Sequence, residues 1–156
     1  MQKRLVRALS TTQAAQGTWL DLEDLVEVEV TSEDPAHPIE AALLSSGGDG
    51  WRAAEPGAQG IRLLFHKPQR LRRIWLRFAE PALERTQEFV VSWSPDGGET
   101  WRALVRQQYT FSPGGATSEI EELRVDLAGV TMLELGIVPD QGKGMAHASL
   151  AEWRLA

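Results

Sequence analysis

Apolar and polar residues alternate along most of this 156-residue chain, with the two-residue period of half-buried β-strands. Proline- or glycine-rich turn segments separate most of the runs. The alternating runs cover residues 26–30, 60–65, 71–78, 89–93, 101–109, 123–127 and 130–138. Helical spacing is confined to two short stretches, near residues 18–25 and 38–44. Short strands with this punctuation predict an all-β fold, a single-domain β-sandwich jelly roll over residues 19–156.

A turn between two alternating runs gives the strongest local signal in the chain. Pro95 presets one backbone dihedral, and Asp96 can accept hydrogen bonds from the backbone ahead of it. Gly97 and Gly98 supply the positive φ angles that such a turn needs. We therefore predict a β-hairpin in which residues 101–109 return antiparallel to the run before the turn.

The chain contains no cysteine, which excludes disulfides, thiolate chemistry and cysteine-ligated zinc. No apolar stretch approaches the ~20 residues of a membrane helix, so we expect no membrane partner. Residues 1–18 are basic, rich in hydroxyl groups and free of acids. They predict a flexible N-terminal segment, with an organellar transit peptide as the alternative. Because no signal-peptide pattern is present, we expect a cytoplasmic location.

Charge is segregated along the chain, whose net charge is −6. Residues 8–51 carry nine acidic side chains and no Lys or Arg, whereas residues 58–79 carry six basic side chains and no acid. One interpretation is a basic face for phosphate or nucleic acid, and the other is mutual neutralisation of the two stretches. Since the whole chain is acidic and lacks the interleaved aromatic residues of single-strand readers, we predict neutralisation and no nucleic-acid partner.

A series of short motifs occurs in the order found in one known family. The motifs are Asp49-Gly50-Trp51-Arg52-Ala53, the runs 60–65 and 71–78, the Ser-Pro-Asp-Gly hairpin, the run 130–138 and Ala148-Ser149-Leu150-Ala151-Glu152-Trp153. Over residues 38–155 the chain resembles the galactose-binding-like, or discoidin (coagulation-factor type C), family. The resemblance implies a β-sandwich jelly roll that holds ligand in loops at one end. It also implies framework positions for Trp51, Trp93, Trp101 and Trp153.

Members of this family that bind sugars often hold a structural calcium through an Asp-Gly turn and a terminal Glu. Asp49 and Glu152 are the residues that could correspond here. The turn before Trp51 is shorter than is usual in the family, and calcium takes six to eight oxygen ligands. We therefore expect no structural calcium and no other cofactor.

Residue patterns typical of catalysis are missing from the sequence. His37, His66 and His147 lie far apart and lack the spacing of a zinc site. No nucleophile motif, matched carboxylate pair or glycine-rich phosphate loop is recognisable. The sequence predicts a non-catalytic binding module rather than an enzyme.

Polar residues in loops and at strand ends are the candidates for ligand binding: His37, Arg106, Gln108, Asp140, Lys143 and His147. The resemblance makes carbohydrate the leading ligand class, because a pyranose offers apolar faces and hydroxyl groups to such side chains. Two alternatives stay open. The loops can be simply solvated, and residues 106–109 can bond across strands to residues 85–88.

A second function fits the same fold. Trp75 lies on the opposite face of its strand from Ile74 and Leu76, so it predicts an exposed aromatic platform between Arg73 and Arg77. Such a platform suits an interface with a protein partner. The alternative to carbohydrate binding is therefore an intracellular protein-interaction or scaffold subunit.

Overall fold

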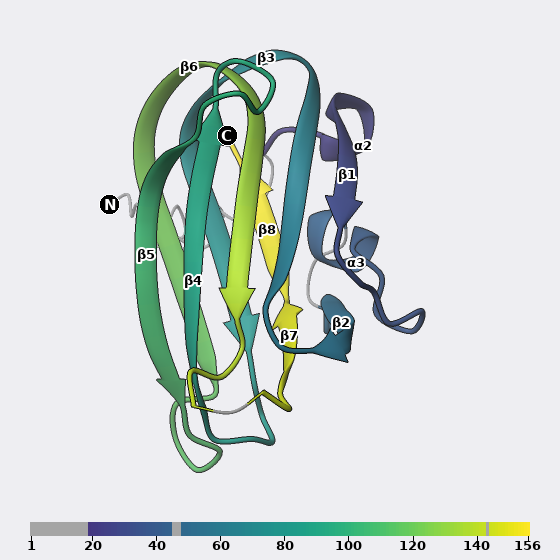
Figure 1. The fold of residues 1–156 in the computed structure, drawn as a ribbon, viewed down its shortest axis with the longest axis vertical. Helices are drawn as coiled ribbons and strands as arrows, with labels where there is room; N and C mark the ends of the chain where they lie inside the picture. The colour runs from purple at the N-terminus through teal and green to yellow at the C-terminus, as the bar shows by residue number, and fades with distance from the viewer. Residues whose placement is uncertain (1–18, 45–47, 143) are drawn as a thin grey trace, which may run out of the picture.

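A computed structural model describes residues 19–44, 48–142 and 144–156 and shows two layers of β-sheet packed face to face (Figure 1). The elements in chain order are α2 (Leu22–Leu25), β1 (Val26–Val30), α3 (Glu40–Leu43), β2 (Trp51–Pro56), β3 (Gln59–Ala79), β4 (Arg85–Ser94), β5 (Arg102–Phe111), β6 (Ser118–Val138), β7 (His147–Leu150) and β8 (Glu152–Leu155). The predicted all-β sandwich is confirmed, with short helices in both stretches of helical spacing. Within the described ranges, no helix is long and apolar enough to cross a membrane.

Strands β3 and β6 run through both layers. The first half of β3 pairs with β1 and with the second half of β6, and the layer has the order β1-β3-β6-β4-β5. The second half of β3 pairs with the first half of β6 and with β8. Both ribbons arch over at one end of the molecule, and the register of their pairing shifts between Leu64 and Arg73 (Figure 1). Strands β2 and β7 form a separate two-stranded sheet.

The prediction of separate strands at 60–65 and 71–78 was wrong, because both belong to β3. Pro68 is exposed where the register with β6 shifts, and a proline is tolerated at such a bulge although it has no N–H. The runs 123–127 and 130–138 are likewise joined in β6. Alternating patterns alone do not reveal that a strand continues through a bend.

The core lies between the two layers and combines many aliphatic side chains with several aromatic rings. The rings of Phe78 and Phe89, on facing strands, have centroids 5.1 Å apart. Trp51 and Trp153 are fully buried and Trp93 is 8% exposed, as the family framework implied. The expectation that Trp101 also lies in the core was wrong, because Trp101 is only half-buried. It follows the hairpin turn and stacks against a guanidinium at the solvent side of the sheet, as described below.

The predicted hairpin forms between β4 and β5. Gly97 and Gly98 have φ angles of 71° and 97°. Asp96 accepts the backbone N–H of Thr100 at 2.8 Å and the hydroxyl groups of Thr100 and Ser94 at 2.6 and 2.8 Å. The bonds from Thr100, followed by the one from Ser94, lower the pKa of Asp96 to about 2. The turn chemistry read from the sequence is therefore the chemistry that the fold uses.

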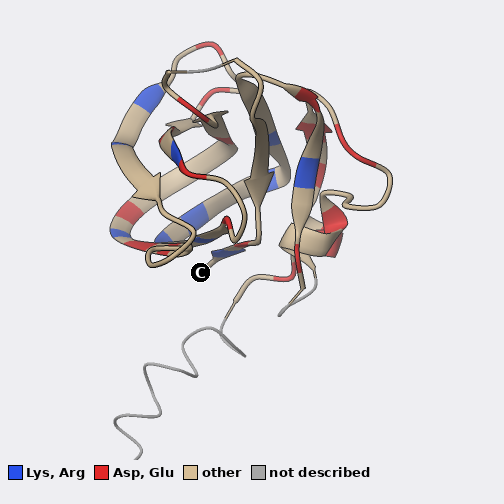
Figure 2. Ribbon diagram, turned by 90° about the horizontal axis from the view of Figure 1, so that it is seen from below, with Lys and Arg blue, Asp and Glu red and all other residues tan. Residues whose placement is uncertain are grey.

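Basic and acidic positions are interspersed over the strands (Figure 2). The basic stretch of β3 is neutralised by acids on neighbouring strands. The ion pairs are Arg62 with Glu29 and Glu134, Arg70 with Asp126, Arg73 with Glu122, and Arg77 with Glu152. The prediction that residues 8–51 neutralise this stretch was therefore largely wrong: among the described residues only Glu29 comes from 8–51, and the other partners come from β6 and β8. The reason is topological, because β6 and β8 are hydrogen-bonded neighbours of β3.

Candidate functional site

Arg52, on β2, lines two hollows. Strand β2 lies in the half of the sandwich away from the arch of β3 and β6 (Figure 1). One hollow has a volume of about 430 Å³ and the other about 460 Å³. The loop between β3 and β4 reaches the first hollow through Pro81, and the segment before β6 reaches it through Thr117. Arg52 lines both hollows, so we take it as the centre of the candidate site.

A tight turn before α3 places His37 beside Arg52. The carboxylate of Asp34 accepts the N–H of Ala36 at 3.0 Å, and the N–H of His37 donates to the carbonyl of Asp34 at 2.8 Å. The N–H of Asp34 donates to the carbonyl of Arg52 at 2.9 Å, and the N–H of Arg52 donates to the carbonyl of His37 at 3.1 Å. On its other side Arg52 pairs with Ser149 of β7. The backbone of the central residue is thus fixed from both sides.

Gly50 allows β2 to start close against the end of β7. Its φ is 75°, and a Cβ built there would lie 2.1 Å from the carbonyl oxygen of Leu150. Only a residue without a side chain fits this position. The Asp-Gly turn of the sequence motif therefore sets the position of Trp51 and Arg52 directly after it.

The charges in the second hollow consist of one acid and one base that do not bond directly. Within the described ranges the guanidinium of Arg52 makes no hydrogen bond or ion pair with a side chain. The N–H of Ala36 is the main cause that lowers the pKa of Asp34, and His37 and Arg52 add to the effect. The site therefore offers an unused cationic donor and a carboxylate that stays charged at neutral pH.

His147 lines the second hollow with a fixed tautomer. Its Nδ1 lies 3.0 Å from the carbonyl oxygen of Ala53. Because a carbonyl only accepts, Nδ1 must carry the proton, and Nε2 of the neutral ring is left as an acceptor. The Nδ1 of His37 lies 3.5 Å from the Asp34 carboxylate but makes no hydrogen bond among the described residues.

The first hollow is rich in hydroxyl groups. Thr117, Ser118 and Ser149 line it together with Asp49 and Arg77. Arg77 is already engaged, because its guanidinium donates to the Glu152 carboxylate at 3.0 Å. The buried Trp51 also lines this hollow. Its chemistry suits a small polar ligand with several hydroxyl groups.

The structure brings together two of the six predicted ligand residues. His37 and His147 line the hollows on either side of Arg52. Asp140 lines neither hollow, and its carboxylate accepts the N–H of Gly142 at 3.2 Å. Lys143 lies outside the described residues. The histidines therefore stay predictions with a shared location, whereas Asp140 has a local role in its loop.

Arg106 and Gln108 lie elsewhere, on the exposed face of β5. Arg106 donates to the carboxylate of Glu88 at 2.9 Å, and Gln108 is the register partner of Glu88. The alternative of bonding across strands between residues 85–88 and 106–109 is thus confirmed. These two residues do not join the site around Arg52.

Glu152, one of the two residues that the resemblance implied for calcium, is held by two cations. Its carboxylate oxygens lie 2.9 Å from Arg77 and 3.2 Å from Arg154. Asp49 lines the first hollow and is exposed. Among the described residues, no group of three or more His, Asp or Glu side chains could hold a metal ion. The carboxylate of Glu152 is therefore already neutralised by two guanidinium groups.

Arg52 is the residue that sequence reasoning missed. It stands inside the Asp-Gly-Trp motif, where its alternation with Trp51 marks it as pointing away from the core. Arg52 stands out only because its backbone pairs with the turn at residues 34–37. That turn lies at least 15 residues before Arg52 in the sequence. No local pattern reports such a contact.

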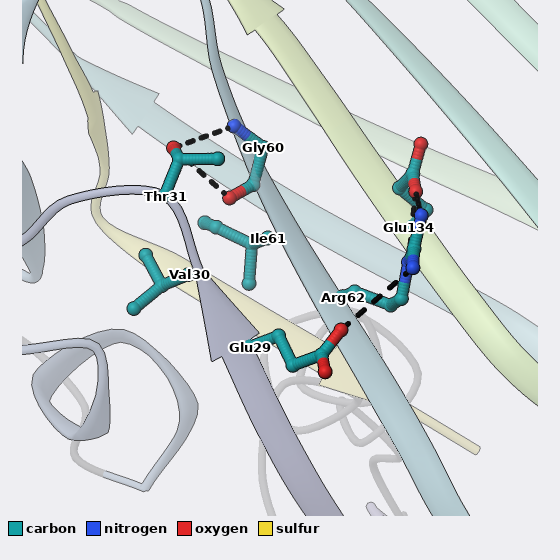
Figure 3. A pocket seen from close by; sticks show the side chains of 7 residues that line it. All are labelled: Glu29, Val30, Thr31, Gly60, Ile61, Arg62 and Glu134. Carbon is teal, nitrogen blue, oxygen red and sulfur yellow. Dashed lines mark hydrogen bonds and ion pairs between the residues drawn. The ribbon is translucent and has the colours of Figure 1, made fainter.

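Another hollow, of about 360 Å³, lies on the outer face of the larger sheet (Figure 3). Arg62 crosses it between Glu29 and Glu134, and it donates to Glu134 at 2.6 and 3.0 Å. Its Cζ also lies 5.0 Å from the ring centroid of Trp101. Since Arg62 is satisfied by its own neighbours, this hollow is an ion-pair network rather than an open binding site.

The predicted interface residues are also engaged within the chain. Trp75 is half-buried. Arg73 donates to Glu122 at 2.6 Å and lies 4.6 Å above the ring of Trp19. Together with the Arg77–Glu152 pair, these contacts leave a protein interface on this face as a prediction.

Solved structures of other proteins share the fold of this chain, although sequence comparisons find no match. No family model matches the chain, and no curated protein matches it in sequence. A solved carbohydrate-binding module, CBM32-3 from a family 31 glycoside hydrolase of Clostridium perfringens, is similar in structure with 18% identity and a TM-score of 0.62, covering 88% of this chain and 93% of that one. CpGH89CBM32-5 from Clostridium perfringens, in complex with GalNAc-β-1,3-galactose, is similar with 16% identity and a TM-score of 0.59, covering 83% and 94%.

A protein of another kind shares the fold. Reduced XRCC1 bound to the DNA polymerase β catalytic domain is similar with 16% identity and a TM-score of 0.56, covering 85% of this chain and 96% of that one. The chain therefore has the galactose-binding-like, or discoidin, fold. That fold serves both glycan-binding modules and a protein that binds a polymerase domain.

Proposed function

We propose that this protein is a non-catalytic carbohydrate-binding module whose ligand site is centred on Arg52. The observation that carries the proposal is the unused guanidinium of Arg52 between two hollows, in a fold shared with modules that bind glycans. A planar guanidinium can donate to two neighbouring hydroxyl groups at once. Asp34 and Nε2 of His147 supply acceptors for further hydroxyl groups.

The chemistry of the site suits binding better than glycoside hydrolysis. A glycosidase needs one carboxylic acid with a raised pKa beside a second carboxylate. Here the N–H of Ala36 lowers the pKa of Asp34, so Asp34 cannot act as a general acid at neutral pH. Glu119 has a raised pKa, but it is 4% exposed and lines neither hollow. The site therefore holds polar ligand groups and provides no matched acid and base.

The test is glycan binding by the Arg52→Ala variant. We first screen the wild-type protein on a glycan array that includes galactosides, and then measure the best ligand by titration calorimetry. Arg52→Ala should weaken binding at least about tenfold, since a charge-assisted hydrogen bond contributes roughly 1.5–3 kcal/mol. The melting temperature should stay within a degree or two, because the side chain makes no bond within the described ranges.

Arg106→Ala is the matched control, because it removes a guanidinium from the exposed face of β5. It should leave glycan binding unchanged. If wild type and Arg52→Ala bind every glycan with equal affinity, the ligand site does not lie around Arg52. Absence of binding to any glycan would refute the proposed function itself.

The second candidate function is protein interaction through the face that carries Trp75. Its support is the similarity to XRCC1 bound to a polymerase domain and the half-buried aromatic ring of Trp75 beside Arg73. Sedimentation of wild type and Trp75→Ala should then differ in oligomeric state or in partner capture, with glycan binding intact. Identical sedimentation and partner capture would leave this face without a role in assembly.

A further inference from the structure

Residues of β1, α2 and α3 line an acidic, apolar groove. These three elements lie together at the edge of the larger sheet opposite β5 (Figure 1). Its volume is about 430 Å³. Val26, Val28 and Val30 form one wall, and Ile39 and Leu43 form another. None of these residues belongs to the site around Arg52.

The valines of β1 face inward but remain half-buried. Among the described strands β1 pairs only with β3 and lies at the edge of the sheet. Leu44, which also lines the groove, is 43% exposed. An apolar floor on an edge strand that stays open to solvent is a feature of surfaces that another segment covers.

Acids surround this floor. Glu23, Glu33 and Glu40 line the groove, and none of the three forms an ion pair within the described ranges. Residues 21–40 contain eight acids and no Lys or Arg. A segment that fills the groove must therefore bring both apolar side chains and positive charge.

The chain itself contains such a segment. Residues 3–9 combine Lys3, Arg4 and Arg7 with the apolar Leu5, Val6 and Leu9, and residues 1–18 contain no acid. The described chain begins at Trp19, and the N–H of Leu20 donates to the carbonyl of Leu155 at 2.8 Å. The ten residues from Leu9 to Trp19 can extend to roughly 35 Å. A tether of this length keeps the segment at a high effective concentration near the groove.

We propose that the groove between β1, α2 and α3 is a docking site for residues 3–9 of the same chain, held by apolar contact and by the acids at its rim. This proposal is independent of carbohydrate binding. A docked segment would cover the open edge of β1 and would be released where salt or a competing acidic surface attracts the basic residues.

The test uses a spin label, since the chain has no cysteine of its own. A nitroxide attached to Gln2→Cys in the full chain should broaden the amide signals of Val28 and Leu43 selectively. Signals of Gln108, on the other edge strand, should stay sharp. At 1 M salt, where the Debye length is ~3 Å, the broadening should weaken.

Charge exchange makes the test specific. Arg4→Glu with Arg7→Glu, or Glu23→Lys with Glu40→Lys, should each reduce the docked population about fivefold, as two exposed ion pairs of medium strength would. All four changes together should restore the broadening. Glu84→Lys with Glu99→Lys, at exposed positions outside the groove, is the control and should have no effect.

Uniform broadening or no broadening in the wild type would overturn the proposal, as would failure of the four-fold exchange to restore it. A mixture of two proteins distinguishes the source of the segment. One is the spin-labelled Gln2→Cys chain without isotope label, and the other is the isotope-labelled wild-type chain, which carries no spin label. Broadening in that mixture would show that a second copy supplies the segment, which also contradicts docking within one chain.

Discussion

A buried carboxyl group on β6 should make this protein more stable when it is neutralised. Glu119 is 4% exposed, and neither of its oxygens has a hydrogen-bond donor among the described residues. It is the register partner of Phe78 and shares its inward face. Burial, and then the neighbouring carboxyl group of Glu121, raise the pKa of Glu119 from its usual 4.5 to about 7.

The sign of the effect follows from this direction. Because the folded state binds the proton more tightly than the unfolded state, the contribution to stability is present below pH 4.5 and is lost as the pH rises through about 7. Each unit of difference between the pKa in the folded state and the pKa in the unfolded state corresponds to about 1.36 kcal/mol. The loss of stability therefore amounts to roughly 3 kcal/mol. Glu119→Gln removes the charge but leaves an amide with unmet hydrogen bonds, which costs about 1–2 kcal/mol at every pH.

We therefore expect Glu119→Gln to be about 1–2 kcal/mol more stable than wild type at pH 8. Between pH 5 and pH 8 the difference between the two proteins should change by about 2–3 kcal/mol. Urea unfolding at intervals of one pH unit measures it, with Glu84→Gln as an exposed control that should follow wild type. Parallel pH profiles for wild type and Glu119→Gln would refute the reasoning.

Three further outcomes follow from the packing. Trp93→Ala should destabilise by about 3–5 kcal/mol and Trp101→Ala, at a half-buried position, by clearly less; equal losses in urea unfolding would contradict the burial described. Gly50→Ala should cost more than about 2 kcal/mol, because its Cβ meets the Leu150 carbonyl, and a wild-type melting curve would exclude that contact. A calcium chelator should leave the melting temperature unchanged, since the Glu152 carboxylate is already paired with two guanidinium groups. A clear drop in the melting temperature would show that a structural calcium is bound.

Local chemistry was the part of the fold that could be predicted from the sequence. The hairpin after Trp93 is determined by Pro95, Asp96 and two glycines, all within a few residues of one another, and it forms as expected. The bend in β3 was not predictable in this way. Pro68 ordinarily ends a strand, and only the shifted pairing with β6 lets the strand continue.

The candidate site divides in the same manner. His37 and His147 were recognisable as polar residues in loops, but no sequence pattern indicates that both lie beside Arg52. Backbone pairing between Arg52 and the turn at Asp34 does so, across a separation that no periodicity reports. Glu119 is a similar case, because alternation alone does not reveal that an acid faces the core.

The path of β3 and β6 has a mechanical consequence. Since each strand belongs to both layers, the layers cannot slide past one another without breaking the pairing between β3 and β6 along most of its length. These two strands therefore act as an internal clamp in a chain that has no disulfide. Shearing or pulling the layers apart should rupture the domain in one step, with no stage at which one layer survives alone.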